Sequence, residues 1–155
     1  MQNTQHTTRA GGGLGAALTG RRVTAVGGGD RLDLVLDGPV TVRVTHEFRV
    51  TGPTGVSLFY PALTFRPTGP LLALVGRTVG SALITPAGGL ELAFTGGDGQ
   101  GGRGGAALSV PPHALIAPWR VVTPDGTVCA GLPGGEVACS GEPTALRPPA
   151  PPRSW

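Results

Sequence analysis

The chain has 155 residues, which suits one domain, and carries a formal net charge of +3 from 12 basic and nine acidic residues. All of the basic residues are Arg, and they are scattered rather than clustered beside aromatic side chains, which argues against a nucleic-acid binder. No apolar run approaches the roughly 20 residues that cross a bilayer, and the first 13 residues lack the apolar core of a secretory signal. We therefore expect a cytoplasmic protein without a membrane segment.

The two ends of the chain differ in composition from its middle. Residues 1–13 are polar and Gly-rich, which predicts a disordered arm. Residues 142–155 are rich in Pro and predict a disordered tail, although a Pro-x-x-Pro run between two Arg residues also has the form of a polyproline ligand. The sequence therefore predicts one folded domain over residues 14–141.

The first half of this domain predicts a β-meander. A strand begins at the sequence "GRRVTAV", and apolar residues then alternate with polar ones through "RLDLVLDGPVTVRV". If both apolar rows face one core, Leu36 lies opposite Val40 and Asp33 lies opposite Arg43 on the outer surface. The outer pair favours strand pairing and solubility rather than a functional site.

The second half of the domain repeats this plan. The sequence "LTGRRVTAV" at 18–26 returns as "LVGRTVGSA" at 74–82, and alternation returns at 90–94 and 106–110. The Gly-rich stretch 96–105 lacks the spacing of a phosphate-binding loop, so we expect a long hairpin loop there. Two related meanders can bury their apolar faces against each other.

The remaining segments complete a small all-β domain. Pro residues between 59 and 76 leave room for one short helix, from Pro70 to Gly76. Turn signals near the C-terminus define three short strands near 119–123, 127–131 and 136–139. We expect about nine mainly antiparallel strands in a small sandwich or partly open barrel, built from two related three-stranded meanders plus a C-terminal hairpin segment, with at most one short helix.

The two cysteines fall opposite each other in the predicted C-terminal hairpin. If residues 133–135 form a three-residue loop, Leu132 pairs with Glu136 and Cys129 pairs with Cys139. That geometry suits a cross-strand disulfide, whereas a reducing cytosol favours two free thiols, and both interpretations stay open. Two Cys residues without further ligands nearby do not make a zinc site.

No cluster of side chains predicts catalysis, a metal site or a cofactor. No nucleophile motif surrounds Cys129, His6 lies in the predicted arm, and most carboxylates fall at turns, where they bond to local backbone. The side chains best suited to a contact surface are aromatic residues and one Arg, because such residues dominate the energetics of interfaces. This candidate contact patch consists of Phe59, Tyr60, Phe65, Trp119, Arg120 and Trp155.

Several ordered motifs resemble one known family. The runs "LTGRRVTAVGGGDRLDLVLDGPVTVRV", "LLALVGRTVGSA" and "WRVVTPDGTVCAGLPGGEVA" are similar to the DUF6188 family of actinobacterial proteins of unknown function, over nearly all of residues 18–139. The chain departs from that pattern where Gly-rich residues near 97–105 replace a short turn. The resemblance implies the limits of the domain and a bacterial source, and it implies no activity.

The sequence therefore favours a binding protein over an enzyme. We expect a non-enzymatic protein-binding module of an immunity-like or regulatory kind, and a homodimer through an edge strand is compatible with this role. The alternative is a small-ligand-binding β-barrel or an enzyme with a pocket near His46 or His113.

Overall fold

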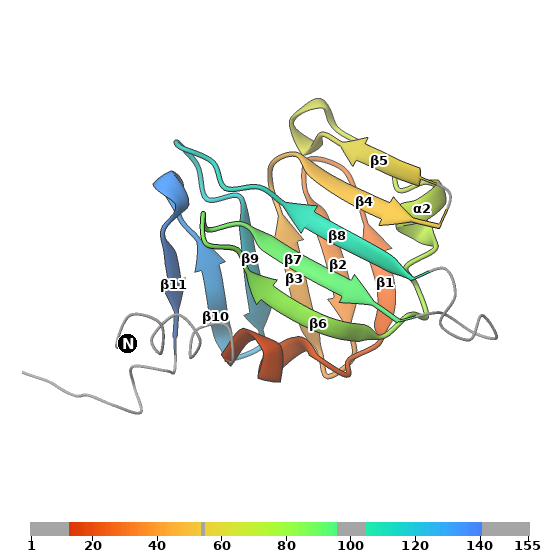
Figure 1. Cartoon of the computed structure of the whole chain (residues 1–155), viewed down its shortest axis with the longest axis horizontal. Coiled ribbons are helices and arrows are strands. Elements are labelled where there is room, and N and C mark those ends of the chain that lie inside the picture. Colours follow the sequence, from red (N-terminus) through yellow and green to blue (C-terminus); the bar gives the residue numbers. More distant parts are fainter. Residues whose placement is uncertain (1–12, 54, 96–104, 141–155) are drawn as a thin grey trace, which may run out of the picture.

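The computed structural model describes residues 13–53, 55–95 and 105–140. Over these residues the chain forms two antiparallel sheets that pack face to face, one behind the other in Figure 1, without closing into a barrel. The predicted all-β sandwich is therefore confirmed, and the barrel alternative is not. None of the helices in these ranges is long and apolar enough to cross a membrane.

Each sheet combines strands from both halves of the chain. The six-stranded sheet has the order β1 (Val23–Gly27), β2 (Leu32–Leu36), β3 (Val40–Val44), β9 (Trp119–Thr123), β10 (Gly126–Gly131), β11 (Val137–Cys139). The five-stranded sheet has the order β5 (Gly55–Phe59), β4 (Phe48–Gly52), β8 (Ala106–Val110), β7 (Leu90–Phe94), β6 (Val79–Ile84).

Alternating apolar residues from both sheets fill the core, as the period of two predicts. The predicted register is confirmed, because Leu36 pairs with Val40 and Asp33 pairs with Arg43. The inward side chains of four central strands are almost completely buried: Leu32, Leu34, Leu36, Val40, Val42, Val44, Leu90, Leu92, Phe94, Leu108 and Val110.

The two halves are copies of one unit that exchange hairpins. Each copy begins with a short helical segment, at residues 13–18 or in α2 (Gly69–Leu72), and continues into a three-stranded meander. The third strand of each meander then leads into a hairpin that joins the other copy's sheet: β4 pairs with β8, and β9 pairs with β3. The predicted relation between the two meanders is therefore confirmed, and it extends beyond them.

The copies meet at a reciprocal set of backbone hydrogen bonds. Its centre is an antiparallel bridge between Arg22 and Thr78, the two residues that follow the repeated Gly-Arg pair. Each bond on one side has a counterpart on the other: Val23 N–H donates to Arg77 O (2.8 Å) and Val79 N–H to Arg21 O (2.9 Å), while Gly20 N–H donates to Val79 O (2.8 Å) and Gly76 N–H to Val23 O (2.9 Å). The repeated sequence therefore forms the junction of the two copies.

Two segments differ from the sequence-based expectation. The structure has 11 strands among the described residues because Phe48–Gly52 and Gly55–Phe59 pair as β4 and β5, which the sequence analysis did not assign. Residues 13–18 are helical, and their Leu14 and Leu18 side chains are fully buried. The predicted helix near Pro70 is present as α2, with the Pro in its first turn.

Arg77 is the buried charged residue of the described core, with 8% of its surface exposed. Its Nε donates to the carbonyl oxygen of Ala73 (3.3 Å), and its Nη1 donates to that of Thr95 (3.2 Å). One side chain therefore ties the end of the α2 segment to the end of β7. Because buried carbonyl groups are costly to leave unpaired, this residue is structural.

We predict that Arg77→Met lowers the free energy of unfolding by about 2 kcal/mol, because it keeps the apolar stem and removes both hydrogen bonds. The matched control is Arg21→Met, since Arg21 makes the equivalent bonds to Ala17 and Asp37 but is more exposed to water. The free energy of unfolding of Arg21→Met should fall by only about 1 kcal/mol. Urea denaturation measures both values, and equal losses would contradict the role of burial.

Candidate functional site

The outer surface of the five-stranded sheet is exposed and unusually poor in charge. The outward positions follow from the strand register: Val56 and Leu58 on β5, Arg49 and Thr51 on β4, Ala107 and Ser109 on β8, Glu91 and Ala93 on β7, and Ser81 and Leu83 on β6. We name this surface the β8 face, after its central strand. It is the surface toward the viewer in Figure 1.

Large apolar side chains lie at both borders of the β8 face. Val56 is 58% exposed, Leu58 is 50% exposed and Leu83 is 46% exposed. The central strand carries only the small side chains of Ala107 and Ser109 at its outward positions. A sheet face that meets only water normally alternates apolar-in with polar-out, so exposed apolar residues beside a flat centre are typical of an interaction surface.

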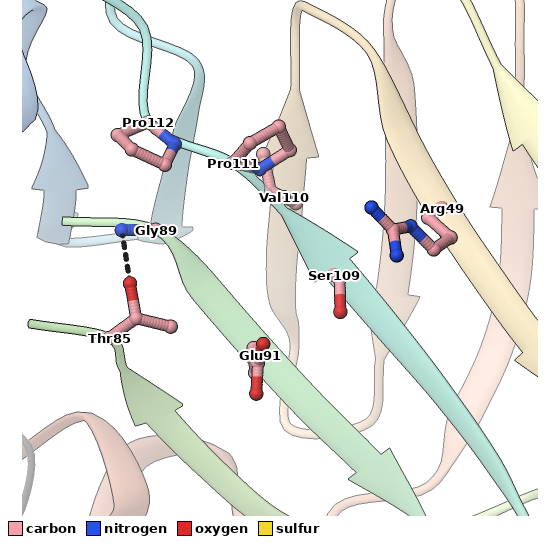
Figure 2. Close-up of a pocket in the computed structure, with 8 residues that line it drawn as sticks. All are labelled: Arg49, Thr85, Gly89, Glu91, Ser109, Val110, Pro111 and Pro112. Carbon is pink, nitrogen blue, oxygen red and sulfur yellow. Dashed lines mark hydrogen bonds between the residues drawn. The ribbon is translucent and has the colours of Figure 1, made fainter. Parts of the chain in front are cut away.

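A row of side chains crosses all five strands in register. Its order is Leu58, Arg49, Ser109, Glu91, Leu83. Figure 2 shows the three central residues on β4, β8 and β7, with Ser109 between the guanidinium and the carboxylate. Within the described parts of the chain, no ion pair joins Arg49 or Glu91 to another side chain. The row therefore presents one positive and one negative group on either side of a small hydroxyl.

The six-stranded sheet carries the equivalent row, but its acidic residue forms an ion pair within the sheet. There Asp33, Arg43 and Arg120 lie side by side on β2, β3 and β9. Arg43 Nε lies 2.9 Å from a carboxylate oxygen of Asp33, and Arg31 lies 3.5 Å from the other oxygen. The acidic group of this sheet is thus already paired.

Ser109 is the residue that makes the two rows differ. It occupies in the second copy the place that Arg43 occupies in the first, while Glu91 takes the place of Asp33. A serine side chain is uncharged, so it cannot form an ion pair with the carboxylate beside it. Among the described residues, Glu91 therefore lacks the cation that its counterpart Asp33 contacts.

A shallow groove lies at one end of the β8 face. Its volume is about 190 Å³, and its lining is Arg49, Thr85, Gly89, Glu91, Ser109, Val110, Pro111 and Pro112 (Figure 2). The hydroxyl oxygen of Thr85 already accepts a hydrogen bond from Gly89 N–H at 2.9 Å. Small-molecule sites are usually about 300–1,000 Å³. This groove is closer in size to a depression that receives one side chain.

The structure brings the two candidate histidines together. The rings of His46 and His113 meet edge to face with centroids 4.3 Å apart, and neither ring lines the groove. Nδ1 of His113 accepts hydrogen bonds from the N–H groups of Leu115 (3.0 Å) and Ile116 (3.3 Å). The Nδ1 lone pair of His113 is therefore already used within its own turn.

His113 therefore caps a turn with the ring nitrogen that its neighbours contact. Among the described residues, no group of three or more His, Cys, Asp or Glu side chains is placed to hold a metal ion.

The aromatic members of the predicted contact patch lie mainly in the core. Trp119 is 1% exposed, and its Nε1 donates a hydrogen bond to Gly88 O at 3.1 Å. Phe59 is 8% exposed, and its ring centroid lies 5.1 Å from that of Phe48 and 5.6 Å from that of Phe65. These rings are buried because they face inward at alternate positions or pack over the end of the sandwich.

The exposed members of the predicted patch do not form one surface. Tyr60 follows β5 of the five-stranded sheet, whereas Arg120 points outward from β9 of the six-stranded sheet. Trp155 lies outside the described residues. The sequence analysis missed Arg49, Glu91 and Ser109, although comparing the two copies position by position would have exposed the change from Arg to Ser.

The two cysteines lie on neighbouring strands at the edge of the six-stranded sheet. Cys129 on β10 lies directly opposite Cys139 on β11, and the structure joins their sulfur atoms at 2.09 Å. β11 is a three-residue strand at the border of the six-stranded sheet, so this bond fastens an edge. Disulfides persist mainly in oxidising compartments. The expected cytoplasmic location therefore stays a prediction.

We predict that reduction of this disulfide releases β11 while the sandwich stays folded. A crosslink that closes a loop of this length contributes about 2–3 kcal/mol, and the strand has only three paired residues to hold it without the bond. Hydrogen exchange with and without reductant measures the effect, and the variant Cys139→Ser should match the reduced protein. Unchanged protection at residues 137–139 would contradict this role.

Comparison with known proteins identifies a family and nothing more specific. The model of a family described as "Family of unknown function (DUF6188)" matches residues 14–141. Searches of curated proteins and of solved structures found no match. Because the match spans most of the chain and includes every motif on which the resemblance rests, the chain belongs to the DUF6188 family of unknown function.

Proposed function

We propose that the chain is a non-enzymatic protein-binding module and that the β8 face is its recognition surface. The observation that carries this proposal is the combination of exposed apolar side chains with a charged pair left without partners in the described chain. Such a module acts by covering the surface of a second protein chain, as immunity and regulatory proteins do.

The chemistry of the β8 face indicates what a partner must offer. The small residues at the centre allow a flat surface to approach closely, and Val56, Leu58 and Leu83 offer apolar contacts around it. Arg49 and Glu91 call for one carboxylate and one cation on the partner, about 10 Å apart across two strand spacings. Charge complementarity of this kind sets the orientation and specificity of a complex more than its affinity.

The alternative function, binding of a small ligand near His46 or His113, has less support. The two histidines contact each other, His113 uses Nδ1 to cap its own turn, and the groove on the β8 face is small. The groove opens onto the same surface as the apolar residues, and it fits one side chain of a bound protein.

We predict that Ala107→Arg abolishes recovery of the protein partner. The large new side chain would project from the centre of the β8 face and sterically block the approach of a flat partner surface. The matched control is Thr41→Arg, because Thr41 occupies the equivalent outward position at the centre of the six-stranded sheet. Affinity capture uses the tagged full chain in cells that also express an untagged copy, with mass spectrometry as the readout.

The capture experiment scores both another protein and the untagged copy as partners. Any partner held by the wild type and by Thr41→Arg, and lost with Ala107→Arg, supports the proposal. Circular dichroism should show the same melting temperature for both variants. Equal recovery with Ala107→Arg, or no partner of either kind with the wild type, would overturn the proposed function.

A further inference from the structure

We propose that the partner of the β8 face is a second copy of the same chain, related by a twofold axis that runs nearly parallel to β8. This inference rests on the proposed function and names its partner. The two five-stranded sheets would pack face to face at about the 10 Å spacing of stacked sheets. The axis would pass over Ala107 and Ser109, whose small side chains allow that approach.

The positions of the two charges carry this inference. β8 is the third of five strands, and Arg49 and Glu91 lie on the strands immediately to either side, in register with Ser109. A twofold axis along β8 exchanges the two sides of the sheet. Arg49 of each copy then lies opposite Glu91 of the other, so both charged groups gain a partner at the same time.

The apolar borders obey the same symmetry. Leu58 and Leu83 occupy the two ends of the row, each two strands from β8. The twofold axis places each of them opposite the other residue in the second copy. The order along the row is therefore apolar, positive, small, negative, apolar. When a second copy of the row is placed opposite it in the reverse order, each charged group faces one of opposite sign and each apolar group faces an apolar one.

The six-stranded sheet does not share this property. Its central row holds Arg43 and Arg120 side by side, and Asp33 is already paired with Arg43. A twofold axis over β3 would bring the two Arg43 side chains together, and like charges in an interface are strongly unfavourable. The row of the five-stranded sheet is thus the self-complementary one of the two.

The size of the β8 face predicts a reversible dimer. Five strands of about five residues cover a surface about 20 Å across and about 17 Å long. The area of such a surface is smaller than the roughly 800 Å² per partner that stable complexes usually bury. We therefore expect a dissociation constant in the micromolar range rather than a permanent dimer.

Charge reversal of the full chain tests the inference. Arg49→Glu gives a copy with two carboxylates, and Glu91→Arg gives a copy with two cations, so each variant repels itself. We expect each to dimerise at least about tenfold more weakly than the wild type in sedimentation velocity. An equimolar mixture of the two should restore dimers, because every carboxylate then faces a cation. Arg120→Glu, at the equivalent position of the other sheet, is the control and should dimerise like the wild type.

Rescue by mixing is the result that a nonspecific effect on solubility or folding would not produce. Wild-type dimerisation that both single variants retain would overturn the inference, and so would a mixture that stays monomeric. An edge-strand dimer would give the first of these results. A wild-type chain that is monomeric up to about 1 mM, while Ala107→Arg still loses another protein in the capture experiment, would overturn self-association and leave the proposed function standing.

Discussion

The backbone pairing between Arg22 and Thr78 is the constraint on which the rest of the structure depends. It aligns the two copies in antiparallel fashion, so that a residue before the bridge in one copy bonds to a residue after it in the other. Neither meander can bury its apolar face alone, and this junction sets the two faces against each other. The exchanged strands complete the junction, because the six-stranded sheet takes three strands from the second copy and the five-stranded sheet takes two from the first.

A duplicated unit also produces two equivalent outer surfaces, and only small changes are needed to make them different. In the first copy the acidic residue of the central row is neutralised by Arg43. In the second copy Ser109 stands at that place, and the acid and the Arg are left on opposite sides of the central strand. The acidic group on the outer surface of the six-stranded sheet is thus paired within the chain. The β8 face instead has apolar borders and two charged groups that we propose a partner contacts.

The sequence was a good guide wherever one face of a strand is apolar and the other is polar. That pattern predicted the meanders, the register of Leu36 with Val40, and the pairing of the cysteines. It failed at β5, where Val56 and Leu58 face outward and Phe59 faces inward, so that no simple alternation marks the buried side. The same exposed residues form the candidate surface, so the departure from the pattern marks the face that we propose for recognition. Phe59 and Trp119 of the aromatic patch lie inside instead, because a core with so few aromatic residues buries the ones that it has.

The most direct measurement is a methyl NMR dilution series on the isotope-labelled full chain. The central claim is that the β8 face, and not the other sheet surface, becomes covered in solution. If so, the methyl signals of Val56, Leu58 and Leu83 shift with protein concentration, while those of Val35 and Val122 on the outer surface of the six-stranded sheet stay constant. Shifts confined to Val35 and Val122, or no dependence on concentration at any of these methyl groups, would contradict it.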